Sequence, residues 1–214
     1  SHRKHSFLIS ERIRMDKKDV IKITLELIKE KKLEKTSIGE IVKRLDSSPG
    51  NLYYHFKSKN DIYKEVLDYS LEEITKYLDR VKTVRNKKNY LFALTRMLIK
   101  TFEEREEILF FLIGIKGSYY LNKELDSPNF LISFKNALLD EKVYMGNEKL
   151  ITLRLNMFLG SIYEVLYVNK LVNNRNLNEK EIEEIYMSFW GNDLEESYKI
   201  YEQNDLIPDL SREN

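Results

Sequence analysis

The segment 48–59 carries the side chains best suited to hydrogen-bond a polar surface. Leu52 and Phe56 lie four residues apart, so in a helix they share one inward face. At 100° per residue the opposite face and its two edges hold Gly50, Asn51, Tyr54, Tyr53 and His55. Lysine and glutamate would keep such a helix soluble. A small residue, an amide and aromatic hydroxyls instead indicate a face that another molecule approaches closely.

Catalytic and metal-binding chemistry has few candidates in the 214 residues. There is no cysteine, which excludes disulfides, a thiolate metal site and a cysteine nucleophile. The three histidines are His2, His5 and His55, so only the last could serve a serine–histidine arrangement. We expect no enzyme, no metal and no cofactor. A carboxylate mechanism stays open as the enzyme alternative.

The composition predicts an all-α fold. Hydrophobic residues make up 42% of the chain and charged residues 33%, enough for a sizeable core. Only 7 Gly and 3 Pro are present, too few for the many turns of an all-β protein.

Three short helices are expected in the N-terminal part, over 16–31, about 37–46 and from 48 onward. Asp16 is a good N-cap for the first, and Ser37 with Glu40 three residues later matches a capping box for the second. Ser48-Pro49 predicts the start of the third. The last two helices, joined by a short turn, fit a helix-turn-helix whose second helix enters the DNA major groove.

The charge is divided unevenly along the chain. Residues 15–64 hold 12 basic and 8 acidic residues, a net charge of +4, whereas residues 65–214 hold 20 and 26, a net charge of −6. Chance variation between solvated faces is one explanation. The other is a basic module that meets a polyanion, attached to an acidic body that does not.

Residues 16–64 resemble the DNA-binding domain of the TetR family of transcriptional regulators. The matching residues are Lys35-Thr36-Ser37-Ile38, Ile41-Val42, Leu45, Ser48-Pro49-Gly50-Asn51-Leu52-Tyr53-Tyr54-His55-Phe56-Lys57-Ser58-Lys59 and Ile62. The turn departs from the family pattern, because Asp46 stands where a glycine is common. We therefore expect Asp46 in the left-handed backbone conformation.

The resemblance implies that the second helix, the third helix and the start of the fourth contact DNA. The residues in these places are Ser37, Ser48, Gly50, Asn51, Tyr53, Tyr54, His55 and Lys59. The two serines and the lysine would meet phosphates, the serines at helix N-termini where backbone N–H groups attract anions. Gly50, Asn51 and Tyr54 would face the groove. Tyr53 and His55 would bond phosphates or base edges, with local packing and local capping as their alternatives.

Three segments follow from this reading. Residues 1–14, which precede the first methionine, are expected to be a vector-derived or disordered extension, and 15–60 the DNA-binding domain. Residues 61–214 are expected to form the ligand-binding and dimerisation domain. Its helices are expected over 60–84, 88–105, 106–121, 126–144, 149–173 and from about 178, with a loose tail at 203–214.

The helix at 149–173 predicts a dimer. Fifteen of its residues are apolar and lie on nearly every side, so it should be buried on every side. Two helices from each of two chains would achieve this, and TetR-family proteins dimerise in that way. A deeply buried helix of a monomer is the alternative. The interface residues expected are Phe158, Ile162, Val165, Ile185 and Phe189.

Aromatic residues in the body suggest a pocket for a small, largely apolar effector. The candidates are Phe102, Phe111, Tyr120, Phe134 and Tyr163, with ordinary core as the alternative. Gly114 is expected near this pocket.

These expectations describe a homodimeric, cytoplasmic regulator of transcription without a membrane span. We expect a repressor that binds a palindromic double-stranded DNA operator and is released by a small-molecule effector. The alternative is a DNA-binding architectural or partner-controlled protein that has no ligand.

Overall fold

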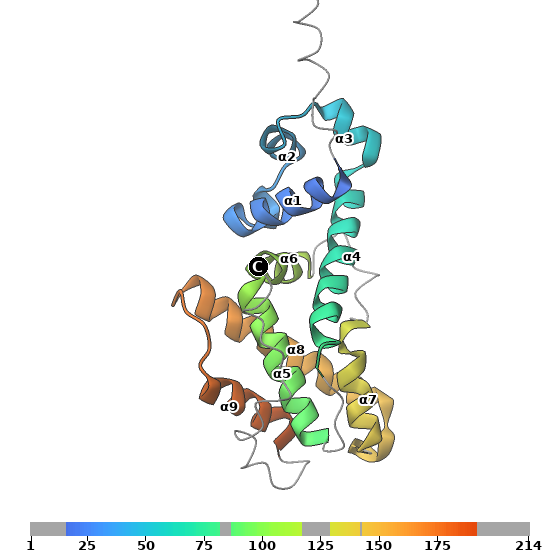
Figure 1. Ribbon diagram of the computed structural model, residues 1–214, viewed down its shortest axis with the longest axis vertical. Coiled ribbons are helices and arrows are strands. Elements are labelled where there is room, and N and C mark those ends of the chain that lie inside the picture. The colour runs from blue at the N-terminus through green and yellow to red at the C-terminus, as the bar shows by residue number, and fades with distance from the viewer. Residues whose placement is uncertain (1–15, 82–86, 117–128, 142, 192–214) are drawn as a thin grey trace, which may run out of the picture.

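The computed structural model describes residues 16–81, 87–116, 129–141 and 143–191, and every regular element among them is helical (Figure 1). This confirms the expected all-α class. The α-helices are α1 (Lys17–Lys31), α2 (Ile38–Arg44), α3 (Pro49–His55), α4 (Lys59–Leu78), α5 (Lys87–Glu104), α6 (Glu106–Ile115), α7 (Ile132–Asp140), α8 (Glu148–Leu171) and α9 (Glu179–Trp190). Short 3-10 turns occupy η1 (Leu33–Lys35), η2 (Asn129–Leu131) and η3 (Val143–Gly146). No helix in these ranges is both long and apolar enough to span a bilayer.

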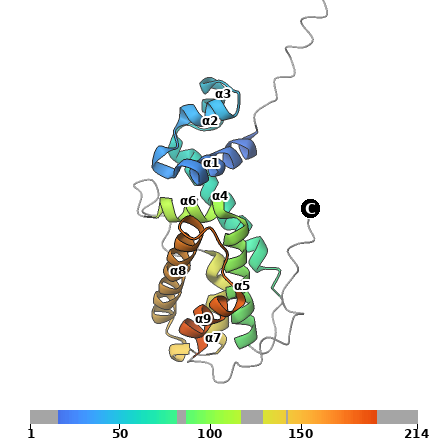
Figure 2. The same cartoon turned by 90° about the vertical axis from the view of Figure 1, so that its left-hand side faces the viewer.

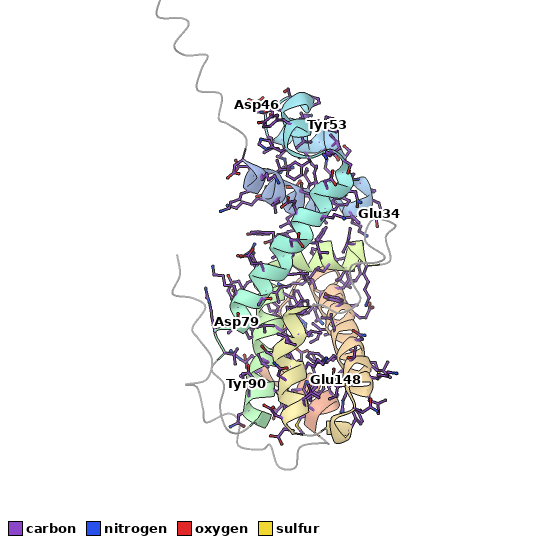
Figure 3. All side chains as sticks on the ribbon, turned by 90° about the vertical axis from the view of Figure 1, so that its right-hand side faces the viewer. Glu34, Asp46, Tyr53, Asp79, Tyr90 and Glu148 are labelled. Carbon is purple, nitrogen blue, oxygen red and sulfur yellow. The ribbon has the colours of Figure 1, made fainter. Side chains whose placement is uncertain are left out.

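Helices α1 to α3 and the start of α4 form a small head at one end of the molecule (Figure 1). Its core includes five residues that are at most 3% exposed: Val20, Ile41, Leu52, Phe56 and Ile62. Asp46 and Tyr53 lie in this head, at the opposite end from Tyr90 and Glu148 (Figure 3). The long helix α4 runs from the head into the body.

Local capping explains why the head helices begin where the sequence predicts. The hydroxyl of Ser37 accepts from the Glu40 backbone N–H at 3.3 Å, and the Glu40 carboxylate accepts from the Ser37 N–H at 3.1 Å. Ser48 caps α3, with Pro49 at its first position. Asp46 has φ 47°, so the turn takes the left-handed conformation expected there.

Helix α5 is the centre of the body. It packs against α4, α6, α7, α8 and α9. Leu91, Leu94, Leu98 and Phe102 on it are fully buried. Figure 2 shows α8 on one side of α5 and α9 near its lower end. The body therefore owes its shape to contacts between segments distant in the chain.

Several body helices differ in extent from the prediction. Helix α4 ends at Leu78, not near residue 84, and α7 ends at Asp140, not near 144, where Tyr144 has φ 51° and breaks helical geometry. The expected ends at 117–121 and 126–128 lie outside the described residues, as do 1–14 and 203–214.

Helix α6 lies crosswise between the head and α8 (Figure 2). A Cβ on Gly114 would stand 3.1 Å from the Leu33 Cβ, so Gly114 faces the head and not a pocket as expected. The Glu106 carboxylate accepts from Lys29 of α1 at 3.0 Å and from Lys170 of α8 at 2.7 Å. One short helix thus contacts both the head and the body.

Candidate nucleic-acid interface

The outer face of α3 is open to solvent. Tyr54 is 82% exposed and Tyr53 is 52% exposed. Leu52, on the opposite face of α3, is fully buried in the core of the head. A Cβ on Gly50 would meet nothing within 4 Å. Large exposed aromatics beside a bare stretch of backbone suit a surface that is covered by a partner.

Asn51 is oriented by the turn before it. Its backbone N–H donates to the Ser48 hydroxyl at 3.2 Å, and its side-chain Nδ2 donates to the Ser47 hydroxyl at 3.2 Å. An amide held in this way can read a base edge with less loss of side-chain freedom. Sequence reasoning missed Ser47. Its place four residues before Asn51, at the opening of the turn, is the signal that could have found it.

The start of α2 is held by an ionic contact as well as by its cap. Lys31 of α1 donates to the Glu40 carboxylate. This bond, with those from Ser37, holds the pKa of Glu40 below its ordinary value. Because the Ser37 hydroxyl also bonds Glu40 at 3.3 Å, its local role is capping, and a phosphate would share it.

Lys59 stands at the N-terminus of α4, half-buried. Its ammonium lies 5.1 Å from the centre of the Tyr63 ring. Burial lowers its pKa, against the attraction of Glu40. A cation that has lost part of its hydration at a helix N-terminus gains from a phosphate placed there.

His55 is partly exposed and lies at the edge of this face. Its ring meets the ring of Tyr54 edge-on, with centres 5.1 Å apart. The structure thus brings the eight predicted DNA-contacting residues to the head, around α3 and the starts of α2 and α4.

The predicted ligand-binding aromatics do not gather around one space. Phe102 and Tyr163 pack with ring centres 5.6 Å apart, but Phe111 packs against Tyr63 at the junction with α4, at 6.2 Å. Phe134 belongs to a cluster with Phe158 and Trp190. Tyr120 lies outside the described residues. Phe102, Phe111 and Phe134 are fully buried core residues.

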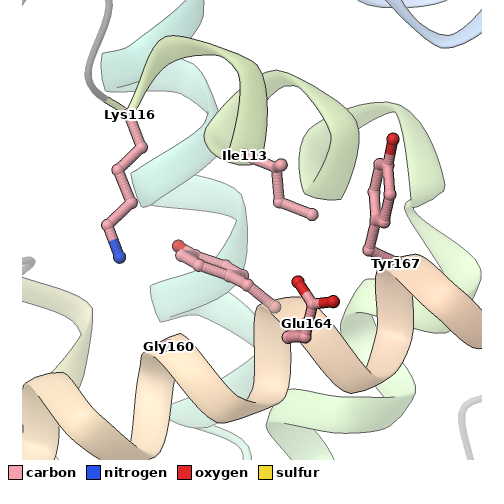
Figure 4. Close-up of a pocket in the computed structure, with 6 residues that line it drawn as sticks. Ile113, Lys116, Gly160, Glu164 and Tyr167 are labelled. Atoms are coloured by element: carbon pink, nitrogen blue, oxygen red, sulfur yellow. The ribbon is translucent and has the colours of Figure 1, made fainter.

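A cavity of about 300 Å³ lies between α6 and the middle of α8 (Figure 4). Its lining residues are Ile113, Lys116, Gly160, Tyr163, Glu164 and Tyr167. Of the predicted ligand residues described, only Tyr163 is in this lining. Burial raises the pKa of its hydroxyl, so the hydroxyl stays protonated. Two charged residues make the lining more polar than the effector prediction assumed.

The predicted interface residues lie mostly inside the protomer. Phe158 and Ile162 are fully buried there, and Val165, Ile185 and Phe189 are partly buried against the core. Helix α8 instead exposes a different set: Leu150, Leu153, Met157, Val168 and Leu171. Any surface that α8 offers to a second copy is therefore made by this second set.

The described residues hold no group of three or more carboxylates and imidazoles that could bind a metal ion. The chemistry on view in the head is hydrogen bonding and charge attraction.

Comparison with known proteins shows what the N-terminal part of the chain is similar to. Residues 20–66 match the model of the bacterial regulatory proteins of the tetR family. A stretch of 55 residues is 44% identical to the HTH-type transcriptional regulator QacR of Staphylococcus aureus, and covers 25% of this chain and 29% of QacR. The match to the HTH-type transcriptional regulator AcrR of Shigella flexneri is 33% identical over 55 residues, and covers 26% of each chain. The matches thus span less than a third of these curated relatives.

The similarity in fold extends much further along the chain. A TetR family transcription regulator from Marinobacter aquaeolei superposes with a TM-score of 0.66 at 18% identity, and the match covers 82% of this chain and 93% of that one. Residues 20–66 therefore match the TetR family model, and the chain shares the fold of TetR-family regulators of known structure.

Proposed function

We propose that this protein is a homodimeric transcriptional repressor that binds a near-palindromic operator and leaves it when a small molecule binds the body. The observation that carries the DNA-binding part is the outer face of α3. Gly50 there is open, Tyr54 is almost fully exposed, and Asn51 is fixed by hydrogen bonds to the turn. The family model of the bacterial regulatory proteins of the tetR family matches residues 20–66, which include α3.

Contacts to phosphate and contacts to bases divide between different residues. Lys59 and the capped starts of α2 and α3 lie where backbone N–H groups attract phosphates. Asn51 and Tyr54 point outward from the middle of α3, where a recognition helix meets base edges.

The dimer and the effector response have separate support. The exposed apolar residues of α8 favour a partner on that face. Ile113 of α6 and Lys116, the residue after its last turn, line the cavity, and Gly114 of α6 lies against Leu33 of the head. A molecule in this cavity therefore touches the helix that supports the head. It shifts operator affinity only as far as it binds the two head arrangements unequally.

Selection of DNA from a random library tests the proposal and yields the operator. We expect an inverted repeat with half-sites one DNA turn, or a multiple of that, apart. Asn51→Ala or Tyr54→Ala should cost about 1–3 kcal/mol on the selected site and relax its sequence preference. Recovery of no sequence preference would contradict the operator, and would favour the architectural alternative.

A further inference from the structure

One side of α8 that is open to solvent carries a stripe that reads nearly the same in both directions. Its members are spaced three or four residues apart, except for an adjacent pair at its centre: Leu150, Leu153, Met157, the partly exposed Gly160 and Ser161, Glu164, Val168 and Leu171. We call this set the α8 stripe. Inverted about the bond between Gly160 and Ser161, it pairs leucine with leucine at its ends and Leu153 with Val168 further in.

This inversion is what a twofold interface requires, because each residue of one copy meets its mirror position on the other. Two α8 helices crossing antiparallel at their centres would place aliphatic residues against aliphatic residues toward both ends of the stripe, Leu150 against Leu171 and Leu153 against Val168. At the crossing point, a Cβ on Gly160 would meet nothing within 4 Å, so a second backbone can approach closely. The stripe therefore fits a second copy of this chain.

The cavity between α6 and α8 opens onto the same stripe. Gly160 and Glu164 belong to both the stripe and the cavity lining (Figure 4). In the inverted pairing, the position opposite Glu164 is Met157 of the other copy. Met157 does not line the cavity of its own protomer, and it is 59% exposed. A second copy would thus supply the wall that one protomer lacks.

We propose that the dimer turns this cavity into an enclosed composite site for a small organic cation, closed by Met157 of the partner subunit. The inference rests on the homodimer of the proposed function and adds the place of the effector and its chemical class.

Charge is the reason for a cation. Within the part of the chain that the structure describes, Glu164 forms no ion pair. Covering it with a methionine of the second copy removes water from the carboxylate, which is costly unless a counter-charge arrives. A cation in the cavity supplies that charge.

The aromatic side chains beside Glu164 also favour a cation. The Lys116 ammonium already lies 5.6 Å from the centre of the Tyr163 ring, so this ring accepts a positive charge on its face. Tyr167 adds a second ring to the lining. An organic cation would take the place of the lysine ammonium, which is tethered to the end of α6. Lys116 is exposed and free to turn toward water.

Calorimetric titration with benzyltrimethylammonium tests the charge. Neopentylbenzene is its neutral counterpart, with carbon in place of nitrogen. The full chain should bind the cation with two sites per dimer, and the neutral compound at least about tenfold more weakly. Glu164→Gln should weaken binding of the cation by about tenfold or more. Glu104→Gln, an exposed carboxylate of α5, is the matched control and should leave binding unchanged.

Mixed dimers test the contribution of the second copy. One copy carries both Glu164→Gln and Met157→Trp, and the other copy is wild type. If the site is shared between copies, Glu164→Gln damages the cavity of the first copy and Met157→Trp fills the cavity of the second, so both sites are lost. If each cavity belongs to a single copy, the cavity of the wild-type copy still binds the cation because Met157 does not line its own cavity, and one working site then overturns the proposal.

Sedimentation and operator binding on the same samples distinguish failure of the composite cation site from failure of the homodimeric repressor. A dimer that binds operator but takes up no cation, or takes up neopentylbenzene as well as the cation, overturns the composite cation site and leaves the repressor standing. A monomer without operator binding overturns the homodimer and the site together.

Discussion

The head and the body of this protein place their functional side chains by different physical means. In the head, hydrogen bonds between residues three or four apart, at Ser37–Glu40 and Ser47–Asn51, fix the helix starts and the amide that faces outward. In the body, the cavity is lined by both Lys116, which directly follows α6, and Glu164 of α8, almost fifty residues later. Local interactions can be read from a sequence, and distant ones require the fold.

The largest expected effect is a loss of operator binding by the head when the dimer contact of the body is broken. Met157→Asp puts a second carboxylate into the α8 stripe, opposite Glu164 in the inverted pairing. The dimer should dissociate at micromolar concentration, because two like charges would be buried together. Operator affinity should fall at least about a hundredfold, since a half-site offers only one head its contacts.

Sedimentation and fluorescence anisotropy measure these two changes. Asn156→Asp, also exposed on α8 but beside the stripe, is the matched control and should disturb the dimer less. Retained helicity by circular dichroism shows that the Met157 variant is folded. A folded Met157→Asp dimer with full operator affinity would contradict the stripe as an interface.

Most of the head could be predicted from the sequence because its helix starts depend on hydrogen bonds between residues close together in the chain. The Asp16, Ser37 and Ser48 starts are confirmed, and so is the left-handed Asp46. Apolar spacing also predicted the inward Leu52 and Phe56. Ser47 escaped prediction because its role depends on where the Asn51 side chain turns.

For the body, the sequence predicted the helices but not which helices pack against one another. Nine α-helices were expected, and nine are found within the described residues. Periodicity assigns Phe158 and Ile162 to an apolar side of α8, but cannot say whether that side meets α5 and α7 or a second copy. The structure buries both inside the protomer. Gly114 was likewise expected at a pocket and is found against Leu33, a contact that no local pattern shows.

A pair of glycine substitutions sharpens the contrast between an open and a packed helix face. Gly50→Ala in α3 meets open space, so it should stabilise the fold by up to about 1 kcal/mol through helix propensity. Gly114→Ala in α6 places a methyl 3.1 Å from Leu33, and crowding should cancel that gain or exceed it by about 1 kcal/mol.

Urea unfolding of the two variants measures the difference. Gly50→Ala should still lower operator affinity, because the added methyl stands on the face that approaches DNA. Equal stabilisation by both substitutions would show that α6 and η1 are not packed as the structure has them.

A smaller effect is expected from a phosphate contact. Lys59→Ala should weaken binding to all DNA sequences alike, and should reduce the slope of log affinity against log salt by about 1, since one phosphate contact releases about one counterion. Lys76→Ala, near the other end of α4, is the control and should leave the slope unchanged. Titrations of operator and of unrelated DNA at several salt concentrations measure both. A slope that Lys59→Ala leaves untouched would remove this lysine from the interface.

The smallest effect tests whether local signals also act in the body. Asn178 and Glu181 form a capping box at the start of α9, and Arg175 donates two hydrogen bonds to the Glu181 carboxylate at 2.7 and 2.8 Å. The arginine and the Asn178 N–H lower the pKa of Glu181 from 4.5 to about 2.

A carboxyl group whose pKa is lower in the folded state than in the unfolded state adds stability above its unfolded pKa. That stability is lost as the pH falls toward the folded pKa. The advantage of the wild type over Glu181→Gln should therefore be constant above about pH 5 and shrink between about pH 4.5 and 2. Unfolding by denaturant at a series of pH values measures this, with Glu104→Gln as control. If the advantage of the wild type were the same at pH 3 as at pH 6, the carboxylate would have no paired charge, and α9 would depend on packing alone.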